Sequence, residues 1–282
     1  MSSNTHCEAD MNHCNSGFLD MECAPKRYAF RGTQQFWDIW EMQWKAQDSE
    51  WVLFTDVDEE TFTRDFLNSP DKIIRKSWNS YDKTNQLLLT KMPISSEHGA
   101  AASGFEAKMT LALAHMGLES KVTGSGSAGH RGYDGGKQPD CQWRPTRPPP
   151  GRSKEWPTVV VEVAVSESAS KAMSDVRWWL RQGDGDVQIV VILRVDRQGP
   201  KITLEKWGRG SNEQPHRHSS VVVYKNSNQP IKVDDGPLVI EFEKLFLRAP
   251  DCPKEKDIIL GDEELKGLAK RIWNAQGFYD EE

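Results

Sequence analysis

Two carboxylates could hold a metal ion, Asp140 and Glu162. Asp140 lies in "KQPDCQWRP", residues 137–145, and Glu162 lies in "TVVVEVAVSES", residues 158–168. The valine-rich run has apolar residues at both parities, which predicts a strand buried on both faces. A glutamate in such a strand is costly to desolvate unless it is protonated, paired or bound to a cation. A strand aspartate and a glutamate of the next strand can converge on Mg²⁺, which prefers carboxylate oxygens and waters.

Each carboxylate also has an ordinary structural interpretation. Asp140 follows a proline, and this dipeptide is common in turns. Glu162 could form a buried ion pair with Lys171 or Arg177 without any metal. Which interpretation holds depends on the polar groups that neighbouring elements bring to the pair.

The regions around the two carboxylates predict an α/β or α+β domain. A helix is expected from Ser95 or Ser96 to Met116, with a serine as N-cap and Gly117 as C-cap. Further helices are expected over residues 168–183 and 261–276. Strands are expected within residues 86–91, 120–128, 140–145, 158–166, 186–196, 201–209, 219–226 and 237–246.

The N-terminal part of the chain has a different character. Residues 1–25 are polar and lack periodicity, which predicts a flexible tail. Residues 26–86 are expected to form a helical extension rich in aromatic residues, and residues 87–282 the main domain. Within the extension, Phe36, Trp40 and Trp44 recur every four residues, which is typical of the packing face of a helix.

Composition excludes some classes of function. The chain has 282 residues and a net charge of -6, so any contact with nucleic acid must use a local basic patch such as "RPTRPPPGRSK", residues 144–154. There is no run of 18 apolar residues and no basic-then-apolar signal at the N-terminus, so no membrane contact is expected. We expect an intracellular protein, nuclear or cytoplasmic.

The order helix, Pro-Asp, strand glutamate, helix resembles the PD-(D/E)xK nuclease superfamily, which has the restriction-endonuclease-like fold. The strings "KQPDCQWRP", "VVVEVAVSES" and "SDVRWWL" are also similar to a group of fungal proteins with that fold. The later strings "VQIVVILRVD", "KITLEKW" and "FEKLFLRAP" fit the same group. The likeness covers roughly residues 87–275. It implies a mixed central sheet flanked by helices.

The resemblance also implies roles for individual residues. Asp140 and Glu162 would be the metal carboxylates, for Mg²⁺ or Mn²⁺. A glutamate of the preceding helix often completes such a site, and Glu97 and Glu106 are the candidates. They are nine residues apart and nearly opposite on a helix, so at most one can face the site. Glu97 is the preferred ligand, because it starts the helix near the end of a strand.

The chain departs from the family motif at one position. Two residues after Glu162 the motif has a lysine, which orients the attacking water and offsets developing charge, and here that residue is Ala164. Lys171 or Arg177 of the following helix could supply the cation, although an arginine cannot act as a base. The cation could also come from a different source, Gln142, Ser166 or Ser168 could have a role, and the site could be inactive.

The expected function is metal-dependent phosphodiester hydrolysis of nucleic acid, with DNA as the first expectation. The alternative is a catalytically inactive nuclease-like domain that binds nucleic acid or a protein partner, which Ala164 favours. A further alternative is an interaction module. In that case the aromatic region around Trp40 and Trp44 would contact a protein partner or a second copy of the chain.

Overall fold

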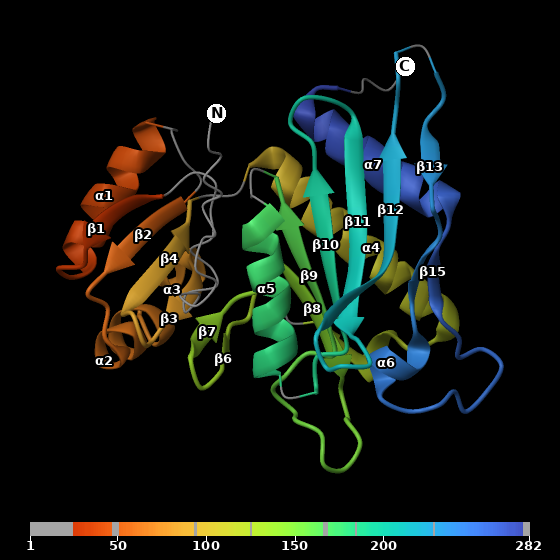
Figure 1. The fold of residues 1–282 in the computed structure, drawn as a ribbon, viewed down its shortest axis with the longest axis horizontal. Coiled ribbons are helices and arrows are strands. Elements are labelled where there is room, and N and C mark those ends of the chain that lie inside the picture. The colour runs from red at the N-terminus through yellow and green to blue at the C-terminus, as the bar shows by residue number, and fades with distance from the viewer. Residues whose placement is uncertain are drawn as a thin grey trace, which may run out of the picture.

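The structure is a computed structural model that describes residues 25–46, 51–92, 95–124, 126–165, 169–183, 185–227 and 229–278. The predicted tail, residues 1–25, lies outside the described residues except at its last position. No helix in the described ranges is long and apolar enough to span a membrane. The chain forms a smaller and a larger sheet that lie beside each other, with helices around them (Figure 1).

The larger sheet has seven strands; Glu162 lies on one of them, and Asp140 directly precedes its neighbour in the sheet. The spatial order is β13 (Lys232–Asp234), β12 (Pro215–Tyr224), β11 (Lys201–Arg209), β10 (Ile189–Val195), β9 (Val159–Ala164), β8 (Cys141–Pro145) and β5 (Val122–Gly124). β9 and β10 are parallel, and the other neighbouring pairs are antiparallel. The sheet is therefore mixed.

Helices cover both faces of the larger sheet (Figure 1): α4 (Ser96–Met116) and α7 (Asp262–Gln276) on one face, and α5 (Ala169–Gln182) on the other. Val159, Val161 and Val163 of β9 belong to the core with α4 and α7, whereas Val160 and Ala164 pack with α5. This double burial explains the continuous apolar run. The predicted fold class, a mixed sheet flanked by helices, is confirmed and is consistent with the restriction-endonuclease-like fold.

The smaller sheet has six strands in the order β1 (Lys26–Ala29), β2 (Trp51–Thr55), β4 (Leu87–Lys91), β3 (Trp78–Asp82), β7 (Gly135–Lys137) and β6 (His130–Arg131). Its helices are α1 (Thr33–Ala46), α2 (Glu59–Thr61), the π-helix η2 (Phe62–Leu67) and α3 (Lys72–Ser77). Residues 26–86 thus form three strands besides the predicted helices. The sheet joins strands from both sides of residue 86, and the domain boundary placed there stays a prediction.

The aromatic stripe of α1 faces the core of the smaller sheet over part of its length. Phe36 and Trp40 are buried, and their ring centroids are 5.2 Å apart. Trp44, in contrast, is 52% exposed. The predicted packing face is therefore confirmed for the first two aromatic residues, and the predicted partner contact stays a prediction.

The remaining elements include a separate two-stranded antiparallel sheet, β14 with β15, whose apolar residues join the core of the larger sheet. They are η3 (Glu119–Lys121), β14 (Leu238–Ile240), α6 (Phe242–Phe246) and β15 (Ile258–Leu260). The strand expected over residues 237–246 stops after three residues, because the chain continues as α6. β7 belongs to the smaller sheet and β8 to the larger one, so the chain crosses between the sheets within "KQPD", residues 137–140.

The close packing of α4 on α7 can be tested at Gly104. A Cβ atom at this position would lie 2.8 Å from Leu268 Cδ1 and 3.2 Å from Arg271 Cδ. Leu268 is buried and has little room to move. We expect Gly104→Leu to lower the free energy of unfolding by about 1–3 kcal/mol in urea denaturation. Thr110→Leu, at an exposed position of the same helix, should change it by no more than about 0.5 kcal/mol. Equal stability of the two variants would contradict this packing.

Candidate active site

The structure brings the two predicted carboxylates together. β8 pairs with β9 so that Cys141 lies opposite Val161, and Asp140 and Glu162 are the next residue on each strand's side of this pair. Asp140 Oδ2 accepts a hydrogen bond from the backbone N–H of Val163 at 2.7 Å. The backbone of β9 therefore fixes the Asp140 carboxylate beside the strand that carries Glu162.

Asp140 has two cationic or protonatable neighbours. His98 Nε2 lies 2.9 Å from Asp140 Oδ1, and Lys91 Nζ lies 3.6 Å from the same oxygen. Burial raises the pKa of Asp140, but the charges of His98 and Lys91 and the hydrogen bonds of the carboxylate outweigh it. The pKa of Asp140 thus lies well below its usual range, and the group is ionised at neutral pH.

Glu162 has a different environment, although it lies on the adjacent strand. Its side chain is almost fully buried, and its Oε1 accepts a hydrogen bond from Trp179 Nε1 at 2.6 Å. Lys137 Nζ lies 3.6 Å from the same oxygen. Burial raises the pKa of Glu162 to about 8, and the attraction of Lys137 offsets this only in part. At neutral pH Glu162 therefore holds a proton for most of the time.

A buried network of lysines and an aspartate adjoins Glu162. Lys137 Nζ is 2.8 Å from Asp175 Oδ1, and Lys171 Nζ is 2.6 Å from Asp175 Oδ2. Ser80 Oγ, at 3.2 Å, also contacts the Lys137 ammonium. Burial raises the pKa of Asp175, but the two lysines outweigh it and lower the pKa overall. We call Lys137, Lys171, Asp175 and Glu162 the buried charge network. It connects β7 of the smaller sheet with α5 and β9.

The two candidate substitutes for the motif lysine lie on different faces of α5. Lys171 is fully buried and reaches the site through its ion pair with Asp175. Arg177 is on the exposed face. Within the described part of the chain, no hydrogen bond or ion pair joins Arg177 to Asp140 or Glu162. The cation nearest to Glu162 comes instead from β7, as Lys137.

Among the described residues, no hydrogen bond or ion pair joins Glu97, the predicted third metal ligand, to Asp140 or Glu162, and its role as a ligand stays a prediction. Glu97 is half-buried in the first turn of α4 and accepts a hydrogen bond from Ser96 Oγ, and Glu106 is exposed. Because each residue of a helix is rotated by about 100° from the last, the side chain of α4 that meets Asp140 is His98 and not Glu97. Among the described residues, no group of three or more His, Cys, Asp or Glu side chains could hold a metal ion.

Of the three other residues for which a role was predicted, the structure describes only Gln142. Gln142 Nε2 donates to the carbonyl oxygen of Ala128 at 2.8 Å, and its Oε1 lies 2.5 Å from His130 Nε2. Both ends of this amide are therefore engaged. Ser166 and Ser168 lie outside the described residues.

The structure adds three residues to the candidate site that the sequence did not predict, namely Lys137, His98 and Asp175. Lys137 lies three residues before Asp140 in "KQPD", which is the only sequence signal for it. His98 and Asp175 lie one residue and four residues from Glu97 and Lys171, so their helices were identified but their inward positions were not.

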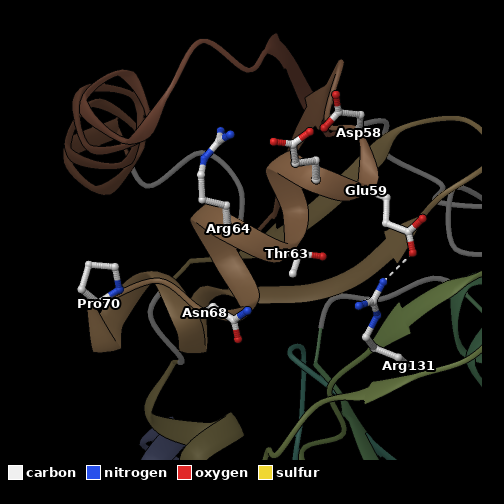
Figure 2. Close-up of a pocket in the computed structure, with 8 residues that line it drawn as sticks. Asp58, Glu59, Thr63, Arg64, Asn68, Pro70 and Arg131 are labelled. Carbon is white, nitrogen blue, oxygen red and sulfur yellow. Dashed lines mark hydrogen bonds and ion pairs between the residues drawn. The ribbon is translucent and has the colours of Figure 1, made fainter.

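Two hollows lie near this region. One of about 410 Å³ opens at Asp140, and Lys72, Lys76 and Lys91 are among the residues that line it. The other, of about 1060 Å³, lies around α2, η2 and β6 (Figure 2). There Arg131 forms an ion pair with Glu59 at 2.7 Å, as Figure 2 shows, and no candidate site residue lines it. Of these two hollows, the smaller one is therefore the one that reaches the candidate site, at Asp140.

Comparisons with known proteins add little to this geometry. No family model matches the chain, and no curated protein matches it. A candidate nuclease belonging to DUF820 from Anabaena variabilis is similar in structure, with a TM-score of 0.39 and 14% sequence identity. The similarity covers 69% of this chain and 90% of that protein. Likeness at this level assigns no role to any residue.

The raised pKa of Glu162 predicts a pH-dependent stability that Glu162→Gln removes. In the unfolded chain Glu162 titrates near 4.5, whereas the folded protein retains the proton up to about pH 8. Between these values the unfolded state binds fewer protons, so this group lowers stability as pH rises. We expect the stability of the variant relative to the wild type to increase from about pH 5 to about pH 8, by on the order of a few kcal/mol.

Urea denaturation in EDTA measures this difference. Glu106→Gln makes the same change on the exposed face of α4 and should show no such pH dependence relative to the wild type. If the Glu162→Gln difference is constant across this pH range, Glu162 is ionised in the folded protein and the description of its environment fails.

Proposed function

We propose that this protein is a metal-dependent nuclease that hydrolyses phosphodiester bonds of nucleic acid, with DNA as its first expected substrate. One observation carries the proposal: Asp140, the residue before β8, is hydrogen-bonded to the backbone N–H of Val163, which follows Glu162 on β9, and the buried ammonium of Lys137 lies 3.6 Å from Glu162. Two carboxylates and one lysine are the chemical groups of the PD-(D/E)xK motif. Here the lysine comes from a different strand.

The donor set suits Mg²⁺ or Mn²⁺ held by Asp140 and Glu162. Both ligands are hard carboxylate oxygens, and Mg²⁺ is commonly held by one or two carboxylates with waters and substrate phosphates as the other ligands. The lack of a third carboxylate is compatible with this arrangement. When bound, the metal would lower the pKa of a coordinated water and stabilise negative charge on the phosphoryl group. Glu162 must lose its proton to serve as a ligand.

The protein groups around the carboxylates have separable roles in this proposal. Lys137 holds a fixed positive charge beside Glu162, where it can stabilise the charge that develops on the phosphate. Asp175 orients the Lys137 ammonium at 2.8 Å, and Lys171 holds the second oxygen of Asp175. Lys171 is therefore a positioning residue, since it acts through Asp175. His98 orients the Asp140 carboxylate.

A catalytically inactive domain that binds nucleic acid is the second candidate, and a specific observation favours it. Both oxygens of Asp140 already have partners, namely the backbone N–H of Val163 and the ring of His98. Lys91 adds a positive charge 3.6 Å away. A metal ion must compete with these cationic neighbours for Asp140. Under this candidate the same pocket would hold a phosphate without cleaving it.

Cleavage assays separate the two candidates. We expect single- or double-stranded DNA or RNA to be cut in Mg²⁺ or Mn²⁺, and Asp140→Asn to lower the rate by about 100-fold or more, because it removes an ionised ligand. Lys137→Met should cause a similar loss. Thermal melting of each variant establishes that it is folded.

Arg177→Met is the matched control for Lys137→Met, since it also replaces a cation by methionine but on the exposed face of α5. Its cleavage rate should stay within about twofold of the wild type. A folded wild-type protein that cuts none of these substrates would refute the nuclease and support the inactive binding domain. Normal cleavage by folded Asp140→Asn would refute the proposed site.

A further inference from the structure

The geometry points to a binding site for one unpaired nucleotide in the hollow that opens at Asp140, with its phosphate on Lys72 and Lys76 of α3. This inference deepens the proposed function, on which it rests, because it assigns the substrate class as single-stranded nucleic acid or a frayed end. It also assigns substrate binding to the smaller sheet and its helices. We call this hollow the nucleotide pocket.

The size of the nucleotide pocket suits a small ligand. Its volume is about 410 Å³, within the range of roughly 300–1,000 Å³ that is usual for small-molecule sites. One wall comes from α1 and α3 of the smaller sheet, and the other side is formed by Gln138, Pro139 and Asp140 at the crossing between the sheets. A ligand in the pocket therefore lies directly beside the candidate catalytic carboxylate.

The charges that line the pocket favour an anion. Lys72, Lys76 and Lys91 face it, and Asp140 is the only acidic residue among its described lining residues. Lys91 is engaged by His98 and Asp140. Lys72 and Lys76 are exposed, and neither has an ion-pair partner in the described part of the chain. They are one helical turn apart, so their charges repel each other, and a phosphate between them would relieve this repulsion.

The rest of the pocket lining favours an unpaired base. Trp40, Ile73 and Met92 supply apolar surface next to the lysines, and Ile73 is 56% exposed although it is apolar. An exposed base can pack on apolar and aromatic side chains irrespective of its identity. The bases of a duplex are stacked and paired, so they cannot enter a pocket of this size without leaving the helix. Hence the pocket selects single strands over duplexes.

The wider hollow of Figure 2 is a poorer candidate for such a ligand. Asp58, Glu59 and Glu60 line it together with Arg64 and Arg131, so its charges are mixed. The Arg131 guanidinium already pairs with Glu59. A phosphate there would meet three carboxylates, whereas in the nucleotide pocket it meets one.

Binding in EDTA tests the inference without cleavage. Fluorescence anisotropy of the full chain is measured with a labelled single-stranded DNA of about ten nucleotides, with the RNA of the same sequence, and with a blunt DNA hairpin duplex. We expect at least one of the two single strands to bind about tenfold or more tightly than the hairpin. The double variant Lys72→Gln/Lys76→Gln should lose about tenfold in single-strand affinity. The slope of log affinity against log salt should become shallower by about 0.7, as for the loss of one phosphate contact on a single strand.

Two further variants complete the experiment. The control variant Lys254→Gln/Lys256→Gln also removes two lysine charges, but at exposed positions that do not line the nucleotide pocket. It should leave the affinity within about twofold of the wild type. Ile73→Ser should weaken single-strand binding with no change in the salt slope, because it removes apolar contact only.

Equal affinity for the hairpin and both single strands, or a loss in Lys72→Gln/Lys76→Gln no larger than in the control, would overturn the inference. The outcome is independent of catalysis. A protein that binds single strands through Lys72 and Lys76 but never cuts them would refute the nuclease and leave the nucleotide pocket intact. Cleavage that needs Asp140 but not Lys72 or Lys76 would support the nuclease and refute the nucleotide pocket.

Discussion

The burial of four ionisable side chains between the two sheets is the constraint on which the arrangement of the site depends. Removal of a charge from water costs several kcal/mol for each ion, even after the protein relaxes. The cost is offset here by the two ion pairs of Asp175, at 2.6 and 2.8 Å, and by the proton that Glu162 retains. Since β7 supplies Lys137, and α5 and β9 supply the others, the smaller sheet cannot separate from the larger one without breaking this balance.

The crossing of the chain within "KQPD" makes the smaller sheet part of the site. Lys137 pairs with Ser80 in the smaller sheet, and Asp140 leads into β8 of the larger sheet. The backbone N–H of Gln138 donates to the carbonyl oxygen of Asn79 at 2.8 Å, which holds the crossing against β3. Lys137 and Asp140, which are three residues apart, thus approach the candidate site from two sheets.

Local signals made much of the larger sheet and its helices predictable. The run of β9 indicates burial on both faces, and Ser95 and Gly117 mark the ends of α4, where the structure has its N-cap and C-cap. Glu162 was a candidate because a carboxylate within a strand buried on both faces needs a partner, and Asp140 was a candidate because of the Pro-Asp dipeptide before the next strand. The smaller sheet was not predictable from the sequence, because β3 has the polar sequence "WNSYD" and because β6 and β7 have only two and three residues. Such strands exist through pairing between distant segments, which periodicity does not report.

Contacts between distant segments also explain why residue 164 is an alanine and not a lysine. This residue is on the face of β9 that also carries Glu162, and it packs with Ala172 of α5 in a buried apolar cluster. A lysine there would add a third buried ammonium next to Lys137 and Lys171, with Asp175 as the only fully ionised partner in the buried charge network. The apolar cluster around Ala164 and the two buried ammonium groups near it therefore favour alanine at this position. The missing motif lysine is no evidence of an inactive site by itself, because the charge near Glu162 depends on the position of β7 and not on the identity of residue 164.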